Sequence, residues 1–214
     1  MKHKIEKNTV QETLILPLYS RKLCTELYPN LYQDETAVRL IDEIDYDFSE
    51  AEKNSRSLMQ RFGALEVAMR QNDLAWEVRD YLKTHPSAAV FFASGVFYYF
   101  LTQQVKALVR GMADAFPGGV LVFDAANRTA VKMIAKTWLR TAKIKDVGAY
   151  FAVSDAPKEI GEWDNRLQVT SRGYMLGYND LRDPSVSGFF RFLARVGDNG
   201  MKMQIVKIGF GGKA

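Results

Sequence analysis

Side chains of the types that do chemistry are few in this sequence, and they lie far apart. The chain has two histidines, His3 and His85, and one cysteine, Cys24. That leaves little for a His/Cys metal site. No histidine neighbours Cys24 to activate it, so we interpret it as a small packing residue. Asp45 and Asp47 could act as a carboxylate pair, but their place at the end of a predicted helix favours solvated turn residues. We expect no metal site.

The composition is that of a globular protein. The chain has 214 residues, of which 47% are hydrophobic and 25% charged, enough for one domain of ordinary size. The formal net charge of +4 is too small to indicate nucleic acid as a partner. A single cysteine favours a reducing compartment. No segment approaches the ~20 apolar residues of a membrane span, and no signal peptide is evident. We therefore expect a cytoplasmic protein with no membrane or nucleic-acid partner.

The first third of the chain has helical patterns. Apolar residues at helical spacing predict a helix over residues 9–24, which Pro17 should kink or interrupt. Asp34 is a good N-cap for a second helix that begins at Glu35. The polar residues 49–57 predict a loop or a loose helix.

A further helix is expected before the character of the sequence changes. Asn72 or Asp73 would open it, and His85-Pro86 would end it. We expect residues 1–86 to form an N-terminal helical cap.

The remainder of the chain alternates between strand and helix patterns. Residues 88–93 and 119–123 are short, apolar and β-prone, as expected of buried strands in a parallel sheet. An amphipathic helix is predicted between them over residues 102–116. This order is typical of a right-handed βαβ unit. Later elements are a helix from about Thr129 that turns Trp138 and Leu139 inward, strands at 167–174 and 203–209, and a Phe-rich helix at 189–193.

Several motifs, in order along nearly the whole chain, resemble one protein family. They are Glu-Thr-Leu-Ile-Leu-Pro-Leu-Tyr-Ser-Arg (12–21), Ile-Asp-Tyr-Asp-Phe (44–48), Arg70, His85-Pro86, Ser-Gly-Val-Phe-Tyr-Tyr-Phe (94–100) and Phe-Pro-Gly-Gly (116–119) leading to Phe123-Asp124. The family is that of leucine carboxyl methyltransferase and the related S-adenosylmethionine-dependent O-methyltransferases linked to polyketide biosynthesis. The resemblance implies an α/β fold with a Rossmann-like class I methyltransferase sheet, helices on both faces, S-adenosylmethionine as cofactor and a small-molecule acceptor with a carboxylate or hydroxyl.

The resemblance also implies roles for particular residues. Arg70 matches the arginine that holds the cofactor's carboxylate; the alternative is a solvated arginine on a helix surface. Ser94 and Gly95 match cofactor-binding positions at a strand's carboxyl end, although Ser94 replaces the family's glutamate; the alternative is a simple strand–helix turn. Tyr99 matches the tyrosine near the substrate, a catalytic position, and its alternative role is core packing.

Four further residues match substrate-binding positions. Thr13, Tyr19 and Arg21 match the lid helix over the active site; helix packing is the alternative for the first two, and a surface charge for Arg21. Asp124, at the end of the fifth-strand equivalent, would face the substrate cleft, and its alternative is an N-cap for the following helix.

One departure from the family pattern decides how the sequence is interpreted. In the family, the His-Pro pair leads into a first strand and a glycine-rich cofactor turn, whereas here the residues after His85-Pro86 run directly into the fourth-strand motif. We therefore expect residues 87–214 to form a truncated methyltransferase-like domain. Two functions remain open: an O-methyltransferase, or a non-catalytic remnant that acts as a binding or dimerisation module. Loss of the first strands would expose a sheet edge and favour a homo-oligomer.

Overall fold

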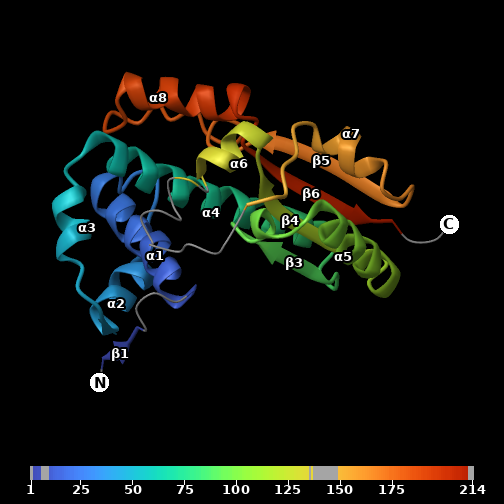
Figure 1. The fold of residues 1–214 in the computed structure, drawn as a ribbon, viewed down its shortest axis with the longest axis horizontal. Helices are drawn as coiled ribbons and strands as arrows, with labels where there is room; N and C mark the ends of the chain where they lie inside the picture. Colours follow the sequence, from blue (N-terminus) through green and yellow to red (C-terminus); the bar gives the residue numbers. More distant parts are fainter. Residues whose placement is uncertain (1, 6–9, 135, 137–148, 212–214) are drawn as a thin grey trace.

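The computed structural model describes residues 2–5, 10–134, 136 and 149–211 (Figure 1). Within them, helices gather at one end of the molecule and a sheet occupies the other. The helices are α1 (Val10–Leu27), α2 (Glu35–Glu43), α3 (Ser49–Asn54), α4 (Leu58–Thr84), η1 (Phe97–Tyr99), α5 (Thr102–Ala115), α6 (Arg128–Ile134), α7 (Ala156–Gly161), α8 (Gly188–Arg195) and the π-helical turn η3 (Val196–Gly200). The strands are β1 (His3–Lys4), β2 (Ile44–Asp45), β3 (Val90–Ala93), β4 (Val120–Ala125), β5 (Leu167–Gly173) and β6 (Gln204–Phe210).

Most predicted helices are present, and local capping explains several of their ends. Asp34 caps α2 by accepting from the Ala37 N–H at 2.8 Å. The α1 helix continues through Pro17 without a break. The polar segment after residue 48 forms the short helix α3. Trp138 and Leu139, assigned to the helix that follows β4, lie outside the described residues.

The prediction that Asn72 or Asp73 opens a helix is wrong. Instead, Ser57 caps α4, which then runs for 27 residues to Thr84. Asp73 lies in the middle of this helix and is fully buried. Its carboxylate accepts from the distant Met175 N–H at 3.1 Å and, more weakly, from the side-chain amide of the neighbouring Asn72 at 3.5 Å. Aspartate often caps helices, but here Asp73 binds a residue far away in the sequence, which the local sequence does not reveal.

The main sheet has four strands in the order β3-β4-β6-β5. The β3 and β4 strands are parallel, with Val90 opposite Val120 and Ala93 opposite Phe123, as the strand–helix–strand pattern predicts. The β6 strand lies between β4 and β5 and is antiparallel to both. The sheet is therefore mixed rather than wholly parallel. A separate parallel pair joins β1 to β2.

Helices cover both faces of this sheet. Along β4, Val120 and Val122 belong to the hydrophobic cluster that includes α4, while Leu121 and Phe123 belong to the one that includes α5 and α7. This alternation follows from the two-residue period of a strand. All six residues of β4 are buried, as expected of an inner strand with neighbours on both edges.

The N-terminal helices and the sheet share one core. Cys24 of α1, Leu65 of α4, Val122 of β4 and Ile205 of β6 belong to a single cluster of buried hydrophobic residues. The segment predicted as a cap, residues 1–86, therefore packs directly on the α/β part through its described residues. None of the described helices combines the length and apolar composition that crossing a membrane requires.

The β3 strand differs from the buried strand predicted at residues 88–93. It starts at Val90 and lies at the end of the strand order, so among the described residues only β4 pairs with it. Its residues are half-buried or exposed, and Phe92 is 43% exposed. An apolar run identifies a strand but does not show whether both of its edges are paired.

Two carboxylates, the buried Asp73 and the half-buried Asp198, hold the turn that follows β5. The Met175 N–H donates to Asp73 Oδ2 at 3.1 Å, and the next N–H, of Leu176, donates to Asp198 Oδ2 at 3.0 Å. Met175 has φ +78°, so the turn is held in a left-handed conformation. Burial raises the pKa of Asp73 to about 7, and burial also raises the pKa of Asp198 to about 7, with the charge of Asp73 adding to the effect.

We expect Asp73→Asn to stabilise the protein increasingly as the pH rises. The folded state holds the Asp73 proton up to a pKa of about 7, whereas the unfolded chain loses it near 3.8. Wild-type stability should therefore fall between these two values, and the asparagine variant should lack that loss, by roughly 2–4 kcal/mol at pH 8. Urea unfolding from pH 5 to 8 measures the difference. The same substitution at the exposed Asp42 is the control. A variant advantage that does not change with pH would contradict the account.

Candidate functional site

A buried polar cluster lies where β3 and β4 end, on the side of the sheet that α4 covers. Nη1 of Arg70 lies 3.3 Å from Oδ2 of Asp124. The backbone N–H of Gly95, just after β3, donates to Oδ1 of the same carboxylate at 2.6 Å. Asp124 faces α4 because it follows Val120 and Val122 at two-residue intervals, and both pack on that side. Three segments of the chain therefore meet at one carboxylate.

Gly95 suits its position for a backbone reason. Its φ is +69°, a backbone conformation that residues other than glycine rarely adopt. A Cβ atom on Gly95 would lie 3.7 Å from both terminal nitrogens of Arg70, so the backbone turn lies directly against the guanidinium. The turn thereby aims its N–H at Asp124.

Three more side chains complete what we call the Arg70 cluster. It consists of Glu66, Arg70, Gly95, Tyr98, Asp124 and Tyr174. The Tyr174 hydroxyl donates to Oε1 of Glu66 at 3.2 Å. The Tyr98 hydroxyl and Nε of Arg70 are buried and make no hydrogen bond of normal geometry with the described residues.

The pKa shifts in the cluster result from burial and from the opposite charges of Arg70 and the carboxylates beside it. Burial alone would lower the pKa of Arg70, but the charge of Asp124 and the surrounding groups outweigh it, and the pKa is raised. Burial raises the pKa of Glu66, with the charge of Arg70 opposing the shift. Burial also raises the pKa of Tyr98 and of Tyr174 well above the usual range for tyrosine. Arg70 is therefore a permanent cation held by a carboxylate whose side chain is fully buried.

The buried face of α4 contains a row of charged residues. Glu66, Arg70, Asp73 and Glu77 recur at intervals of three and four residues, which places them along one side of the helix. Asp73 and Glu77 are both buried. Glu77 accepts from the Tyr178 hydroxyl at 2.8 Å and pairs with Lys207 at 2.6 Å. Such spacing was present in the sequence, but charges in a helix usually mark the solvated face.

The structure brings three of the predicted cofactor and substrate residues together and decides between their alternatives. The Arg70 side chain is only 19% exposed and pairs with Asp124, so the interpretation as a solvated surface arginine is wrong. Asp124 does not cap the following helix, because Asn127 does so by accepting from the Ala130 N–H at 3.0 Å. Ser94 lies beside Gly95 and is half-buried.

Tyr99 lies outside this cluster. It is 46% exposed at the end of η1, so it is not a core residue either, while its neighbour Tyr98 is buried against Asp124. The 3₁₀ turn between β3 and α5 decides which tyrosine points inward. No periodic pattern predicts that choice in so short an element.

The predicted lid residues lie in the N-terminal helices and have structural partners. Tyr19 is buried and stacks on Phe48, with ring centroids 5.6 Å apart. Arg21 is not a free surface charge, because its Nε donates to Asp34 at 2.8 Å and to the Tyr32 hydroxyl at 3.3 Å. Thr13 belongs to α1, and its side chain lies outside the described part of the structure.

The remaining reactive residue types have ordinary structural environments. Cys24 is fully buried, and burial raises the pKa of its thiol to about 12, which agrees with a packing role. Asp47 accepts from the Ser49 N–H at 3.0 Å, as a turn residue does. His85 stacks on Tyr81 at 4.2 Å. No group of three or more His, Cys, Asp and Glu side chains among the described residues could hold a metal ion.

A cavity of about 470 Å³ opens near the same end of the sheet. Its walls come from the start of α5, from α6 and from residues 149–152, and they include the basic side chains Arg128 and Lys132. Ligands of open α/β sheets bind outside the carboxyl ends of the strands. This place in the fold is therefore the natural one for a small molecule.

Comparison with known proteins does not identify the chain. No family model, no curated protein and no solved structure matches it.

We expect Asp124→Ala to reduce the free energy of unfolding by about 3–5 kcal/mol, because it leaves Arg70 buried without a counter-charge. Urea unfolding measures the loss. Asp114→Ala is the matched control, since Asp114 pairs with Arg166 at 2.8 Å but is 65% exposed; this variant should lose less than about 1 kcal/mol.

A second variant separates charge from packing. Adding Arg70→Met to Asp124→Ala removes the unpaired guanidinium and should recover part of the lost free energy of unfolding. Equal losses for Asp124→Ala and Asp114→Ala, or no recovery, would show that the buried ion pair does not organise this end of the sheet.

Proposed function

We propose that this chain is a non-catalytic α/β protein, related to the O-methyltransferases its motifs resemble, that acts by pairing with a second copy of itself. The pairing surface is the outer edge of β3. The observation that carries the proposal is that this edge, where an additional strand would bind, has no strand partner among the described residues.

The composition around β3 supports self-association. Natural sheet edges are usually blocked by charged residues, prolines or bulges. Here residues 87–105 contain neither a charged residue nor a proline. The exposed hydrophobic side chains close to the edge are Phe92 at 43%, Val96 at 43%, Tyr99 at 46%, Phe100 at 42% and Leu101 at 52%.

A second copy suits this edge better than an unrelated partner would. Two β3 strands related by a two-fold axis run antiparallel, so the unpaired N–H and C=O groups of one satisfy those of the other. No charge would have to be buried, because the strand has none. The two four-stranded sheets would then form one continuous sheet.

The Arg70 cluster supports a non-catalytic role. S-adenosylmethionine is the cofactor that the resemblance implies, and Arg70 is the residue that would bind its carboxylate. That guanidinium already pairs with Asp124, and the Gly95 turn packs so closely that a Cβ atom there would lie 3.7 Å from the guanidinium nitrogens. Between His85 and β3 there is no glycine. The residues present therefore do not fit the cofactor.

We expect the wild-type protein to be a dimer and Phe92→Lys to be a monomer, because the lysine places a charge at the centre of the shared edge. Light scattering coupled to size exclusion gives the mass of each. Phe189→Lys on α8 is the matched control, since Phe189 is 50% exposed but far from β3 in the sequence; this variant should remain a dimer. A monomeric wild-type protein at high concentration, or a Phe92→Lys variant that is still a dimer, would contradict the proposal.

A second candidate function is methyl transfer to a small molecule. One observation favours it: Arg70 and Gly95 meet at the carboxyl ends of β3 and β4, and the cavity of about 470 Å³ lies near the same ends. In this alternative, Arg70 would have to release Asp124 to bind another carboxylate.

Calorimetry with S-adenosylmethionine separates the two candidates. We expect no binding at millimolar concentration, because the carboxylate of Asp124 already occupies the guanidinium that the ligand would need. Micromolar binding that Arg70→Lys weakens would instead establish the second candidate. Thermal unfolding of the lysine variant confirms that it is folded before it is titrated.

A further inference from the structure

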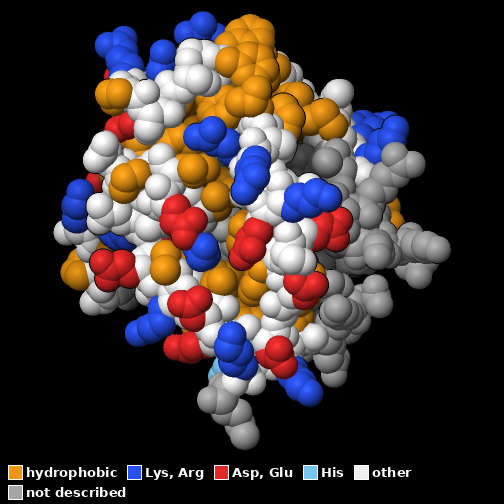
Figure 2. Space-filling model, turned by 90° about the vertical axis from the view of Figure 1, so that its left-hand side faces the viewer, with side chains coloured by type: hydrophobic (Ala, Val, Ile, Leu, Met, Phe, Trp, Pro, Cys, Tyr) orange, Lys and Arg blue, Asp and Glu red, His pale blue; other side chains and the backbone are white. Residues whose placement is uncertain are grey.

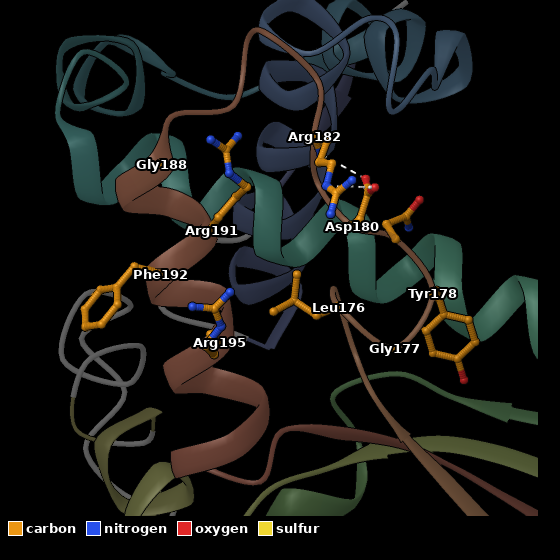
Figure 3. Close-up of a pocket in the computed structure, with 10 residues that line it drawn as sticks. Leu176, Gly177, Tyr178, Asp180, Arg182, Gly188, Arg191, Phe192 and Arg195 are labelled. Atoms are coloured by element: carbon orange, nitrogen blue, oxygen red, sulfur yellow. Dashed lines mark hydrogen bonds and ion pairs between the residues drawn. The ribbon is translucent and has the colours of Figure 1, made fainter.

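A larger cavity, of about 910 Å³, lies beside α8, away from the Arg70 cluster (Figure 3). It opens between α8 and the segment that follows β5. Its lining residues are Leu176, Gly177, Tyr178, Asn179, Asp180, Arg182, Gly188, Arg191, Phe192 and Arg195. This volume is within the range of small-molecule sites.

Three arginines surround the cavity and come from both of its walls. Arg191 and Arg195 are four residues apart on α8, so they lie on the same side of the helix, and Arg182 comes from the opposite segment (Figure 3). Asp180 is the one carboxylate in the lining. The lining therefore carries an excess of two positive charges.

Much of the hydrogen-bonding capacity of these arginines is unused. The guanidinium of Arg195 makes no hydrogen bond or ion pair with any residue that the structure describes. Arg191 uses Nη1 to donate to the carbonyl oxygens of Val186 at 2.7 Å and Leu181 at 3.4 Å, which neutralises no charge. Only Arg182 has a carboxylate partner, Asp180 at 3.4 Å, and both side chains are exposed.

The wall opposite α8 is held rigidly. The carboxylates of the buried Asp73 and the half-buried Asp198 accept from the N–H groups of Met175 and Leu176. The Tyr178 hydroxyl donates to Glu77, and the ring of Tyr178 contacts Trp76 edge to face, with centroids 5.6 Å apart. A pre-organised wall lowers the entropy that a ligand would lose on binding.

We propose that this cavity binds a phosphate-bearing ligand. Guanidinium groups present planar donor pairs that match phosphate oxygens, and arginine is the usual residue for that recognition. Three guanidinium groups around one cavity suit a group with two or more negative charges better than they suit a single carboxylate. The site is independent of the β3 edge.

The rim of the cavity suggests where such a phosphate group would come from. Phe189 and Phe192 of α8 and Val196 at the start of η3 are spaced three and four residues apart and are 50%, 56% and 37% exposed. Figure 2 shows hydrophobic side chains gathered at the top of this end of the molecule, where α8 lies in Figure 1, with Lys and Arg side chains beside them. A lipid headgroup with its acyl chains near these residues and a soluble phosphate ester both offer the required chemistry.

The test uses two probes and one pair of variants. Inorganic pyrophosphate is titrated by calorimetry, and vesicles of phosphatidylcholine with and without phosphatidic acid are used in a flotation assay. The double variant Arg182→Ala/Arg195→Ala removes two guanidinium groups whose loss should not disturb folding, because Arg195 has no partner and Arg182 is 83% exposed. Arg110→Ala on α5 removes an exposed arginine outside the cavity.

We expect wild type and Arg110→Ala to bind alike and the double variant to bind at least about tenfold more weakly. Pyrophosphate binding identifies a soluble phosphate ester as the ligand class. Binding only to phosphatidic acid vesicles, weakened by Phe192→Ala, identifies a lipid headgroup. Absence of binding to both probes, or binding that the double variant leaves unchanged, would overturn the proposal.

Discussion

The carboxylate of Asp124 is the constraint on which the structure depends most. Its side chain is fully buried near the end of the inner strand β4, where an unpaired charge would cost several kcal/mol. Arg70 and the Gly95 N–H satisfy it together. These partners belong to α4 and to the turn after β3, so one group fixes the long helix and both parallel strands relative to one another. The left-handed conformation of Gly95 is what allows the N–H to reach the carboxylate.

Charged residues along α4 make further polar contacts of the same kind with the segment that follows β5. Glu66, Asp73 and Glu77 lie on the same side of the helix as Arg70, and each binds a group that follows β5: the Tyr174 hydroxyl, the Met175 N–H and the Tyr178 hydroxyl. The segment between β5 and α8 is thereby attached to α4 by polar contacts. Buried polar networks specify one arrangement because each unmet partner is costly. These contacts hold in place the residues that form one wall of the arginine-lined cavity.

The two proposals concern surfaces that this internal network leaves unused. Among the residues that the structure describes, the outer edge of β3 has no strand partner, and Arg191 and Arg195 on α8 have no carboxylate partner. The Arg70 cluster, by contrast, has its charges satisfied internally. The resemblance implied that Arg70 binds a ligand's carboxylate, whereas in this structure its guanidinium pairs with Asp124. The two proposed binding surfaces lie on other elements.

The sequence by itself determined the elements that rest on local physics: the capped start of α2, the stop of α4 at His85-Pro86, the amphipathic α5, and the parallel pairing of β3 with β4. Tertiary structure alone decided the place of β6 between β4 and β5, the burial of Asp73 in mid-helix and the choice of Tyr98 over Tyr99. The reason is range: periodicity and capping act over a few residues, whereas strand order and the pairing of buried charges depend on partners about 30 to 100 residues away in the chain.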